Sequence, residues 1–226
     1  MQQYETNMIQ EPHSPVDPHM VASWIKGWTL ARETPLPIPE YGGFRVDVGW
    51  PQQQVRYVFP YPGDGFHHLA HTITAPWIHL KVCAPPEMIS PILPSRWIIQ
   101  PPGFMMSCST VLQSPGSGLP EGYTLEVTEA LPVPVVKILA PDHQLAAIGR
   151  IAFADDVVIY DRIETCPGNR RLGLGSMIMN TLGTIANTYG KHKGILVATA
   201  EGKALYETLG WETRTLYTTA VIPGNE

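Results

Sequence analysis

The sequence is poor in charged residues and in cysteine, and each shortage excludes a class of protein. Charged residues make up 15% of the 226 positions and apolar residues 44%, whereas an average soluble domain is roughly 25% charged. This balance indicates much buried surface, or an interface, and argues against a disordered chain. The three cysteines are an odd number at wide spacing, so we expect no disulfide framework and a reducing compartment.

Long apolar runs are also missing. No run reaches the roughly 18 residues that a helix needs to cross a bilayer. Residues 1–18 are polar and lack the basic start and apolar stretch of a signal peptide. The net charge of −5 gives no support to a nucleic-acid partner. We therefore expect a cytoplasmic protein that binds neither nucleic acid nor membrane.

Proline, in contrast, is abundant, with 23 residues that cluster before position 135. Prolines divide a chain into short elements and argue against long helices. The best linker candidate is the Ser-Pro-Gly-Ser-Gly run at 114–118. We therefore divide the chain into a flexible tail (1–18), an N-terminal α/β half (19–120) and a C-terminal half (121–226).

The N-terminal half begins with a predicted helix that ends near residue 33. Asp17 suits the N-cap and Pro18 the first helical position. Apolar residues then recur at helical spacing, at Val21, Trp24, Ile25 and Trp28. Further strands are predicted at 44–48, 55–59, 77–82, 97–99 and 104–112, and helices at 64–74 and 86–93.

The C-terminal half is more regular. Four successive strands, joined by short turns and so antiparallel, are predicted at 123–128, 133–139, 145–153 and 157–164. A glycine-rich loop follows the fourth strand. After the loop we expect a helix at 176–189, a strand at 195–198, a helix at 202–209 and a strand at 213–221.

The glycine-rich loop has the features of an anion site. Gly173 and Gly175 let the backbone approach a ligand, and the helix that follows presents unpaired N–H groups. Arg170 and Arg171 add two cations, and the whole suits a pyrophosphate. A Walker A loop is excluded because no lysine precedes Ser176. The dinucleotide fingerprint is excluded because it needs three glycines after the first strand of a parallel unit.

The spacing Arg170-x-x-Gly173-x-Gly175 resembles the loop with which the GNAT (GCN5-related N-acetyltransferase) family wraps the pyrophosphate of coenzyme A. Pro167 stands three residues before Arg170, as is usual there. Residues 204–211 resemble the family's Ala-x-x-Tyr-x-x-x-Gly-Phe helix, with tryptophan for phenylalanine. The resemblance covers roughly residues 121–221. It implies an α+β fold whose mixed, mainly antiparallel sheet is flanked by helices, with the N-terminal α/β half packed against it.

The resemblance also implies acetyl-CoA as the co-substrate, without a metal. In the family, the strand before the loop splays open, and its backbone bonds the pantetheine arm and the thioester oxygen. The cofactor-binding residues implied are Ile163, Thr165, Arg170, Arg171, Leu172, Gly173, Leu174, Gly175 and Ser176.

Two side chains are candidate catalytic residues by the same resemblance. Tyr206 matches the family's general acid near the thioester sulfur, and the alternative is a tyrosine buried against the sheet. Asp161 is the candidate base, because strand alternation places it on one face with Ile163 and Thr165. The alternative for Asp161 is a solvated charge or a pair with Arg162.

A histidine pair and Cys166 are also considered as candidate site residues. His67 and His71 share a helix face as zinc ligands do, but His68 replaces the metalloprotease glutamate, so surface or acceptor-side histidines are favoured. Cys166 has no base nearby in the sequence and is interpreted as packing.

The predicted function is therefore transfer of an acetyl group from acetyl-CoA to the amine of a small molecule, by direct attack in a ternary complex. The alternatives are a non-catalytic acyl-CoA sensor, or acylation of a protein or aminoacyl-tRNA. A homodimer is one option for the assembly.

The family pattern breaks at one point. Family members place two helices between their first two strands, and these helices shape the acceptor site. Here about four residues join 123–128 to 133–139, too few for a helix. Residues 19–112 must replace that wall, either as a degenerate second copy of the fold or by completing one composite sheet.

Overall fold

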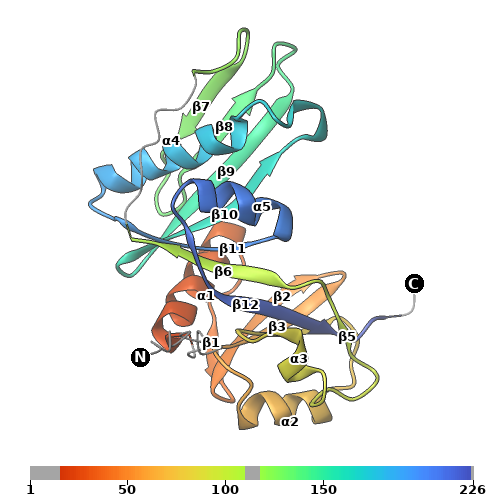
Figure 1. Cartoon of the computed structure of the whole chain (residues 1–226). Helices are drawn as coiled ribbons and strands as arrows, with labels where there is room; N and C mark the ends of the chain where they lie inside the picture. Colours follow the sequence, from red (N-terminus) through yellow and green to blue (C-terminus); the bar gives the residue numbers. More distant parts are fainter. Residues whose placement is uncertain (1–15, 110–117, 225–226) are drawn as a thin grey trace, which may run out of the picture.

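The computed structural model describes residues 16–109 and 118–224, which form a mixed, mainly antiparallel sheet flanked by helices (Figure 1). The helices are α1 (Pro18–Arg32), α2 (Asp64–Thr72), α3 (Pro86–Ile89), α4 (Leu174–Thr188) and α5 (Ala200–Thr208). The strands are β1 (Ile38–Glu40), β2 (Gly43–Trp50), β3 (Gln53–Phe59), β4 (Ile78–Val82), β5 (Ile98–Ile99), β6 (Gly103–Cys108), β7 (Thr124–Thr128), β8 (Val135–Leu139), β9 (Leu145–Ala154), β10 (Val157–Thr165), β11 (Lys193–Ala198) and β12 (Glu212–Val221). Most of the predicted tail, most of the predicted linker and the end of the strand predicted to reach 112 lie outside the described residues.

The two halves of the chain share one sheet. Its strand order is β1-β2-β3-β4-β12-β6-β11-β10-β9-β8-β7, and β5 pairs with β12. Within the described ranges, β3 with β4 and β10 with β11 are parallel pairs, and the other pairs are antiparallel. The composite sheet that was one expectation for residues 19–112 is therefore present.

The halves also follow the same path through the sheet. The order β2-β3-α2-β4 repeats as β9-β10-α4-β11, with an antiparallel hairpin followed by a parallel crossover in each. A short helix and a last strand complete each half. The last strand of the first half, β6, pairs with β11, whereas the last strand of the second half, β12, pairs with β4. Each half thus donates its final strand to the other, which ties the two into one folding unit.

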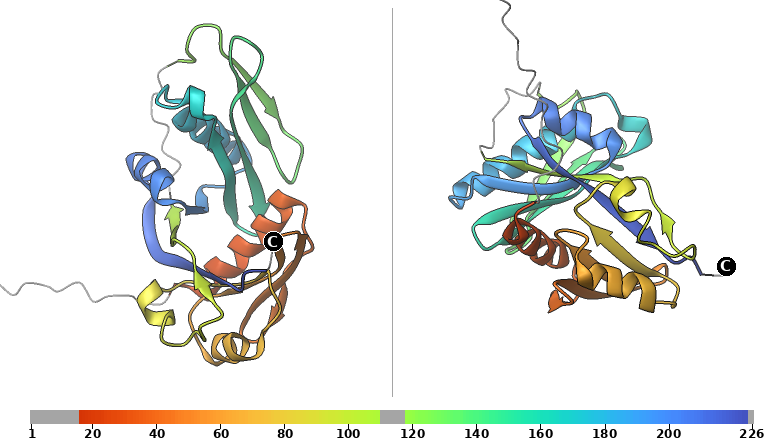
Figure 2. Two further views of the ribbon diagram at one scale, coloured as in Figure 1. Left: turned by 90° about the vertical axis from the view of Figure 1, so that its right-hand side faces the viewer. Right: turned by 60° about the horizontal axis from the view of Figure 1, so that its bottom comes forward.

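Helix α1 forms as predicted and fixes the relation of the halves. The Asp17 carboxylate accepts a hydrogen bond from the His19 amide (2.9 Å), and Pro18 occupies the first turn. The helix contacts β9, β10 and β11 on one side and β2 and β3 on the other (Figure 2). Its buried Trp24 and Trp28 belong to a core that both halves build. Truncating such a tryptophan to alanine costs about 3–5 kcal/mol.

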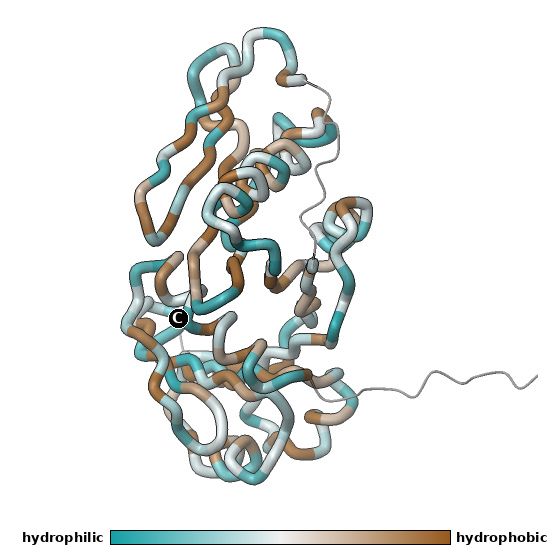
Figure 3. Tube along the Cα trace, turned by 90° about the vertical axis from the view of Figure 1, so that its left-hand side faces the viewer, coloured by the Kyte–Doolittle hydropathy of each residue, from teal (hydrophilic) through white to brown (hydrophobic). Residues whose placement is uncertain are grey.

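The opposite face of the C-terminal strands is covered by α4 and α5. Helix α4 packs on β8, β9 and β10, and α5 packs on β6 and β11. Ile178 and Leu182 of α4 are fully buried there. Figure 3 shows hydrophobic and polar stretches alternating along the chain in both halves. Within the described ranges, none of the helices has the length and apolar composition needed to span a membrane.

Most predicted elements are present with bounds shifted by a few residues, and three differences matter most. Strand β1, which contains Pro39, was not predicted; it lies at the edge of the sheet, where proline is tolerated. Helix α3 ends at Ile89 rather than 93. Helix α4 begins at Leu174, two residues before the predicted start, so that the loop glycines lie at the helix N-terminus.

Candidate active site

Strands β10 and β11 diverge at the centre of the sheet. They pair at three positions, Val157 with Lys193, Val158 with Gly194 and Ile159 with Ile195. Beyond Ile159, β10 continues along β9 to Thr165, and β11 continues along β6 to Ala198. The backbones of 160–165 and 196–198 therefore separate, which is the splayed arrangement that the family resemblance implies.

A β-bulge changes which side chains of β10 face the same way. The register with β9 shifts between Asp161 and Glu164, and Arg162 has a positive φ of 51°. Asp161 faces α1, where it meets Arg32, whereas Ile163 packs into the core under α4. The expectation that Asp161 shares a face with Ile163 and Thr165 is wrong, because the bulge interrupts the alternation of the strand.

The loop after β10 is held in one shape by hydrogen bonds. A 3-10 turn spans Pro167–Asn169, and the Tyr123 hydroxyl donates to the Asn169 side chain (2.7 Å). Arg171 (φ 65°) and Gly173 (φ 76°) lie in the left-handed region and turn the chain into α4. The first amides of α4 have no acceptor within the helix, so they present N–H groups and the positive end of the dipole at the loop.

Most of the predicted cofactor residues gather at this helix N-terminus. Arg170, Arg171, Leu172 and Gly173 are exposed, Ser176 is half-buried, and Leu174 is buried and anchors the turn. A Cβ on Gly175 would lie 2.9 Å from a Leu205 methyl and 3.8 Å from the Thr165 hydroxyl, so α5 and the end of β10 approach closely here. Arg170 pairs with Glu201 at 3.0 Å. Both partners are more than half exposed, so an anionic ligand can replace Glu201 at little cost.

Tyr206 projects from α5 into the core on the same side as α4. It is 7% exposed, and its ring centroid lies 6.2 Å from that of Trp211. Burial, and then the nearby charge of Asp161, raise the pKa of Tyr206 to about 12. The phenol therefore keeps its proton across the physiological range, as a proton donor must.

Asp161 is held by an arginine that the sequence did not indicate. The Arg32 guanidinium donates from Nε and Nη2 to the two carboxylate oxygens, at 2.8 and 2.9 Å. The Asp161 side chain is 11% exposed and Arg162 points to solvent, so Asp161 is neither a solvated charge nor a partner of Arg162. Trp28 stacks near Arg32, with its ring centroid 5.0 Å from the guanidinium carbon.

Three further polar side chains near Arg32 are not indicated by the sequence pattern. Arg56 of β3 lies over the Trp28 ring at 3.7 Å, and Lys81 of β4 donates to the Thr219 hydroxyl at 2.8 Å. Tyr217 of β12 is 4% exposed. In the sequence these side chains are marked only as polar residues at alternating strand positions. The sequence does not reveal which face of those strands is buried.

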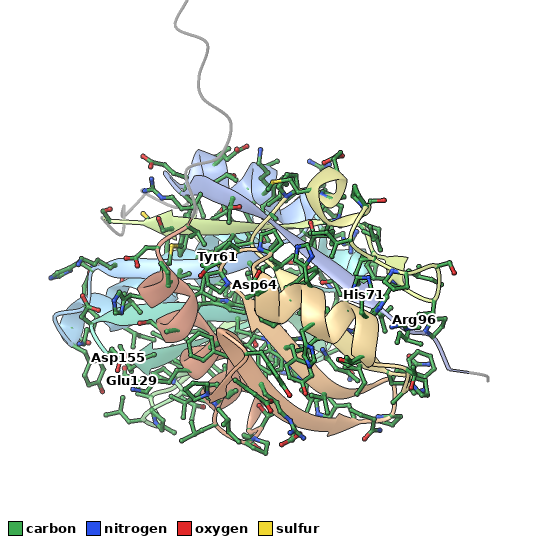
Figure 4. All side chains as sticks on the ribbon, turned by 90° about the horizontal axis from the view of Figure 1, so that it is seen from below. Tyr61, Asp64, His71, Arg96, Glu129 and Asp155 are labelled. Atoms are coloured by element: carbon green, nitrogen blue, oxygen red, sulfur yellow. The ribbon has the colours of Figure 1, made fainter. Side chains whose placement is uncertain are left out.

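His67 and His71 lie on α2, away from this site. Both are exposed, and a ring nitrogen of His71 lies 2.9 Å from the His67 carbonyl oxygen. Figure 4 shows Asp64 at one end of α2 and His71 beside Arg96 at the other. Arg96 donates to the His71 carbonyl and so caps the helix. Over the ranges 16–109 and 118–224, no three potential metal ligands come together.

His79 of β4 makes stability depend on pH. Burial lowers its pKa from the usual 6.5 to about 4, with a smaller contribution from Lys81. The unfolded chain binds this proton below pH 6.5 and the folded chain does not, so stability falls between pH 6.5 and 4. We expect a loss of roughly 1–2 kcal/mol, discounted for partial exposure. Urea titrations at the two pH values measure it, and His79→Gln should flatten the difference; an equal loss in this variant would contradict the assignment.

Comparison with solved structures places this architecture among known folds. A GCN5-related N-acetyltransferase from Kribbella flavida superposes with a TM-score of 0.66 at 14% identity, over 94% of this chain and 98% of the other. A second, from Sphaerobacter thermophilus, gives 0.56 at 10% identity over 95% of each chain. A GCN5-related N-acetyltransferase-like protein from Streptococcus suis gives 0.52 at 13% identity, over 80% and 83%. No protein-family model matches the sequence, and no curated protein matches it.

Proposed function

We propose that this chain, which has the fold of the GCN5-related N-acetyltransferases, transfers an acyl group from acyl-CoA to the amine of a small molecule. The acyl group is acetyl in the simplest case. The observation that carries the proposal is the position of the loop: an N–H-rich helix terminus with two exposed arginines stands beside the point where β10 and β11 diverge. An elongated ligand with a pyrophosphate fits that combination.

The donor side uses the residues that the sequence indicated. The amides at the start of α4, with Arg170 and Arg171, bind the pyrophosphate. The backbone of β10 from Ile163 to Thr165 follows the pantetheine arm, and the acyl thioester then lies between the diverging strands. Gly173 and Gly175 leave room for the ligand and for α5.

The chemical step needs few groups. The lone pair of a neutral amine attacks the thioester carbonyl carbon and forms a C–N bond, and the C–S bond then breaks. The sulfur leaves with the bonding electrons and takes a proton, while the amine nitrogen loses one. The products are an amide and a free thiol. Tyr206 supplies the proton to sulfur, because its high pKa keeps the phenol protonated.

Asp161 is the proposed acceptor of the amine proton, directly or through water. Both of its oxygens already accept hydrogen bonds from Arg32, so a proton must use a remaining lone pair. Asp161→Asn should lower kcat without changing the Kd for acetyl-CoA. It should also cost about 1–3 kcal/mol of stability, because Arg32 loses its ionic partner. Steady-state kinetics and urea unfolding measure the two effects.

The matched control is Asp156→Asn. Asp156 pairs with Lys193 on the surface, with both side chains about two-thirds exposed or more. This change should cost less than about 0.5 kcal/mol and leave kcat intact. An Asp161→Asn enzyme that folds and turns over normally would remove Asp161 as the base.

The pairing of Asp161 with Arg32 also favours a second candidate, a protein that binds acyl-CoA without turnover. In that protein Asp161 would have a structural role only, as the link between α1 and β10. The thiol-release assay separates the two. Release of CoA from acetyl-CoA on addition of an amine supports the enzyme, whereas tight acetyl-CoA binding with no release on a broad amine panel supports the binding protein.

We further propose that residues 19–120 are a degenerate copy of the same fold that has lost the donor site. The repeated order of elements and the reciprocal exchange of β6 and β12 support this. The segment equivalent to the loop, between β3 and α2, carries no arginine pair. In this arrangement the N-terminal half supplies the acceptor side of the enzyme.

A further inference from the structure

Arg32, Arg56 and Lys81 form a group of three basic side chains, the cationic cluster, on the α1 side of the sheet. They come from α1, β3 and β4, so the N-terminal half provides all three. Arg32 and Arg56 both lie over the Trp28 ring. The Lys81 ammonium nitrogen lies 5.8 Å from the centroid of the Tyr217 ring, which borders the cluster. Burial, and then the charges of Arg56 and Arg32, hold the pKa of Lys81 well below its usual value.

The positive charge of this cluster is not balanced by the chain. Arg32 is paired with Asp161, but neither Arg56 nor Lys81 forms an ion pair with any residue that the structure describes. Arg56 is 7% exposed. A guanidinium buried to this extent without a counter-charge is unfavourable, because it loses hydration and gains no anionic partner.

Buried hydrogen-bond donors without partners surround the cluster. They are Nε of Arg56, Nε2 of Gln53 and the hydroxyl of Tyr217, and none has a hydrogen-bond partner among the described residues. All three side chains are more than nine-tenths buried. Native proteins rarely leave several donors unsatisfied in one place. Three orphan donors beside a buried guanidinium and a lysine amine, neither with an anionic partner among the described residues, are the complement of an anion.

The cluster lies on the acceptor side of the proposed reaction. Asp161 lies beyond the last residue of β10 that pairs with β11, and its ion pair with Arg32 joins it to the cluster. The CoA loop is on the α4 side, whereas the cluster is on the α1 side. A group that binds next to Asp161 on the α1 side is therefore beside the cluster.

We infer that the cationic cluster binds an anionic group of the acceptor, so that the acceptor is an amine that also carries a carboxylate or a phosphate. Amino acids are the simplest members of this class. The inference rests on the proposed function, because it places the amine next to the thioester. In this arrangement Lys81 and Arg32 donate hydrogen bonds to the anion, and the buried Arg56 attracts it electrostatically.

The test compares matched acceptor pairs in the thiol-release assay. The carboxylate pairs are alanine with ethylamine, phenylalanine with phenethylamine and ornithine with putrescine; the phosphate pair is O-phosphoethanolamine with ethanolamine. Wild-type protein should show a KM at least about 10-fold lower for the anionic member of one series. Which series shows the difference identifies the anion. Equal KM values within every pair would overturn the inference.

Lys81→Met supplies the second arm. It should raise the KM for acceptors with an anionic group on the order of 10- to 100-fold. The KM for the partner amines without that group, and the Kd for acetyl-CoA, should not change. Lys137→Met, at an exposed position of β8, is the matched control and should change neither. If Lys81→Met does not fold, Lys81→Gln serves. An equal fall in kcat for both members of each pair would overturn the inference, since Lys81 would then act on the amine.

A calorimetric experiment distinguishes failure of the proposed acyl transfer from failure of the anion site. If acetyl-CoA binds but no amine releases thiol, alanine and O-phosphoethanolamine are titrated by calorimetry into protein saturated with acetyl-CoA. Binding that Lys81→Met abolishes and Lys137→Met retains would support the anion site without catalysis. The absence of binding to the wild-type protein would overturn the anion site as well.

Discussion

Gly173→Val is expected to raise the Kd for acetyl-CoA by roughly 100-fold or more, which corresponds to about 2.7 kcal/mol. Gly173 has a φ of 76° at the N-cap of α4. A β-branched residue is disfavoured there, by about 1–2 kcal/mol, and its side chain would stand where the pyrophosphate meets the helix amides. Isothermal titration with acetyl-CoA measures the effect.

Gly190→Val is the matched control for this variant. Gly190 follows the other end of α4, with a φ of 67°, and beyond its chain neighbours no heavy atom lies within 4 Å of the place that a Cβ would take. The backbone strain is therefore similar, and both variants should lose a similar amount of stability. Acetyl-CoA binding should survive only in Gly190→Val. Equal affinities in the two variants would show that the loop is not the donor site.

Tyr206→Phe is expected to lower kcat by about 100-fold or more, the effect of removing a general acid. The Kd for acetyl-CoA should stay the same, because the hydroxyl acts on the departing sulfur. The pKa of Tyr206 is raised to about 12, so the phenol stays protonated below that pH. Loss of this proton should therefore not lower the kcat of the wild-type protein until the pH approaches 12. Steady-state kinetics from pH 6 to 10 test both points.

Tyr160→Phe is the control for loss of a buried tyrosine hydroxyl. Tyr160 packs edge-on against Trp211, as a neighbour in the same core as Tyr206, and its hydroxyl has no hydrogen-bond partner in the described part of the chain. Its removal should leave kcat unchanged and leave stability equal or slightly higher. A kcat for Tyr206→Phe as high as that for Tyr160→Phe would remove the acid role.

The elements that local pattern determines were predictable from the sequence. Helix α1 follows from the spacing of its tryptophans and from Asp17-Pro18, and the turn into α4 follows from the glycines before it. Both signals lie within about 15 residues of chain, where helix geometry and backbone freedom dominate. The predicted fold class, a mainly antiparallel sheet flanked by helices, is confirmed. It was predictable because local patterns determine most of its helices and strands.

The region proposed as the acceptor side was not predictable, because its arrangement depends on pairings that are distant in sequence. Arg32 and Asp161 are 129 positions apart, and Lys81 and Thr219 are 138 apart. The exchange of β6 and β12 has no local signal, since either strand could complete its own half. The bulge at Arg162 lacks a glycine that would mark it, so the orientation of Asp161 predicted from strand alternation was wrong.

The most direct test of the central claim is a crystal structure with acetyl-CoA bound. We predict that the pyrophosphate contacts the first amides of α4 and Arg170 or Arg171. The thioester should lie between β10 and β11, with the sulfur near the Tyr206 hydroxyl and the acetyl group facing Asp161. Acetyl-CoA bound elsewhere on the chain, or with its pyrophosphate away from α4, would contradict the account.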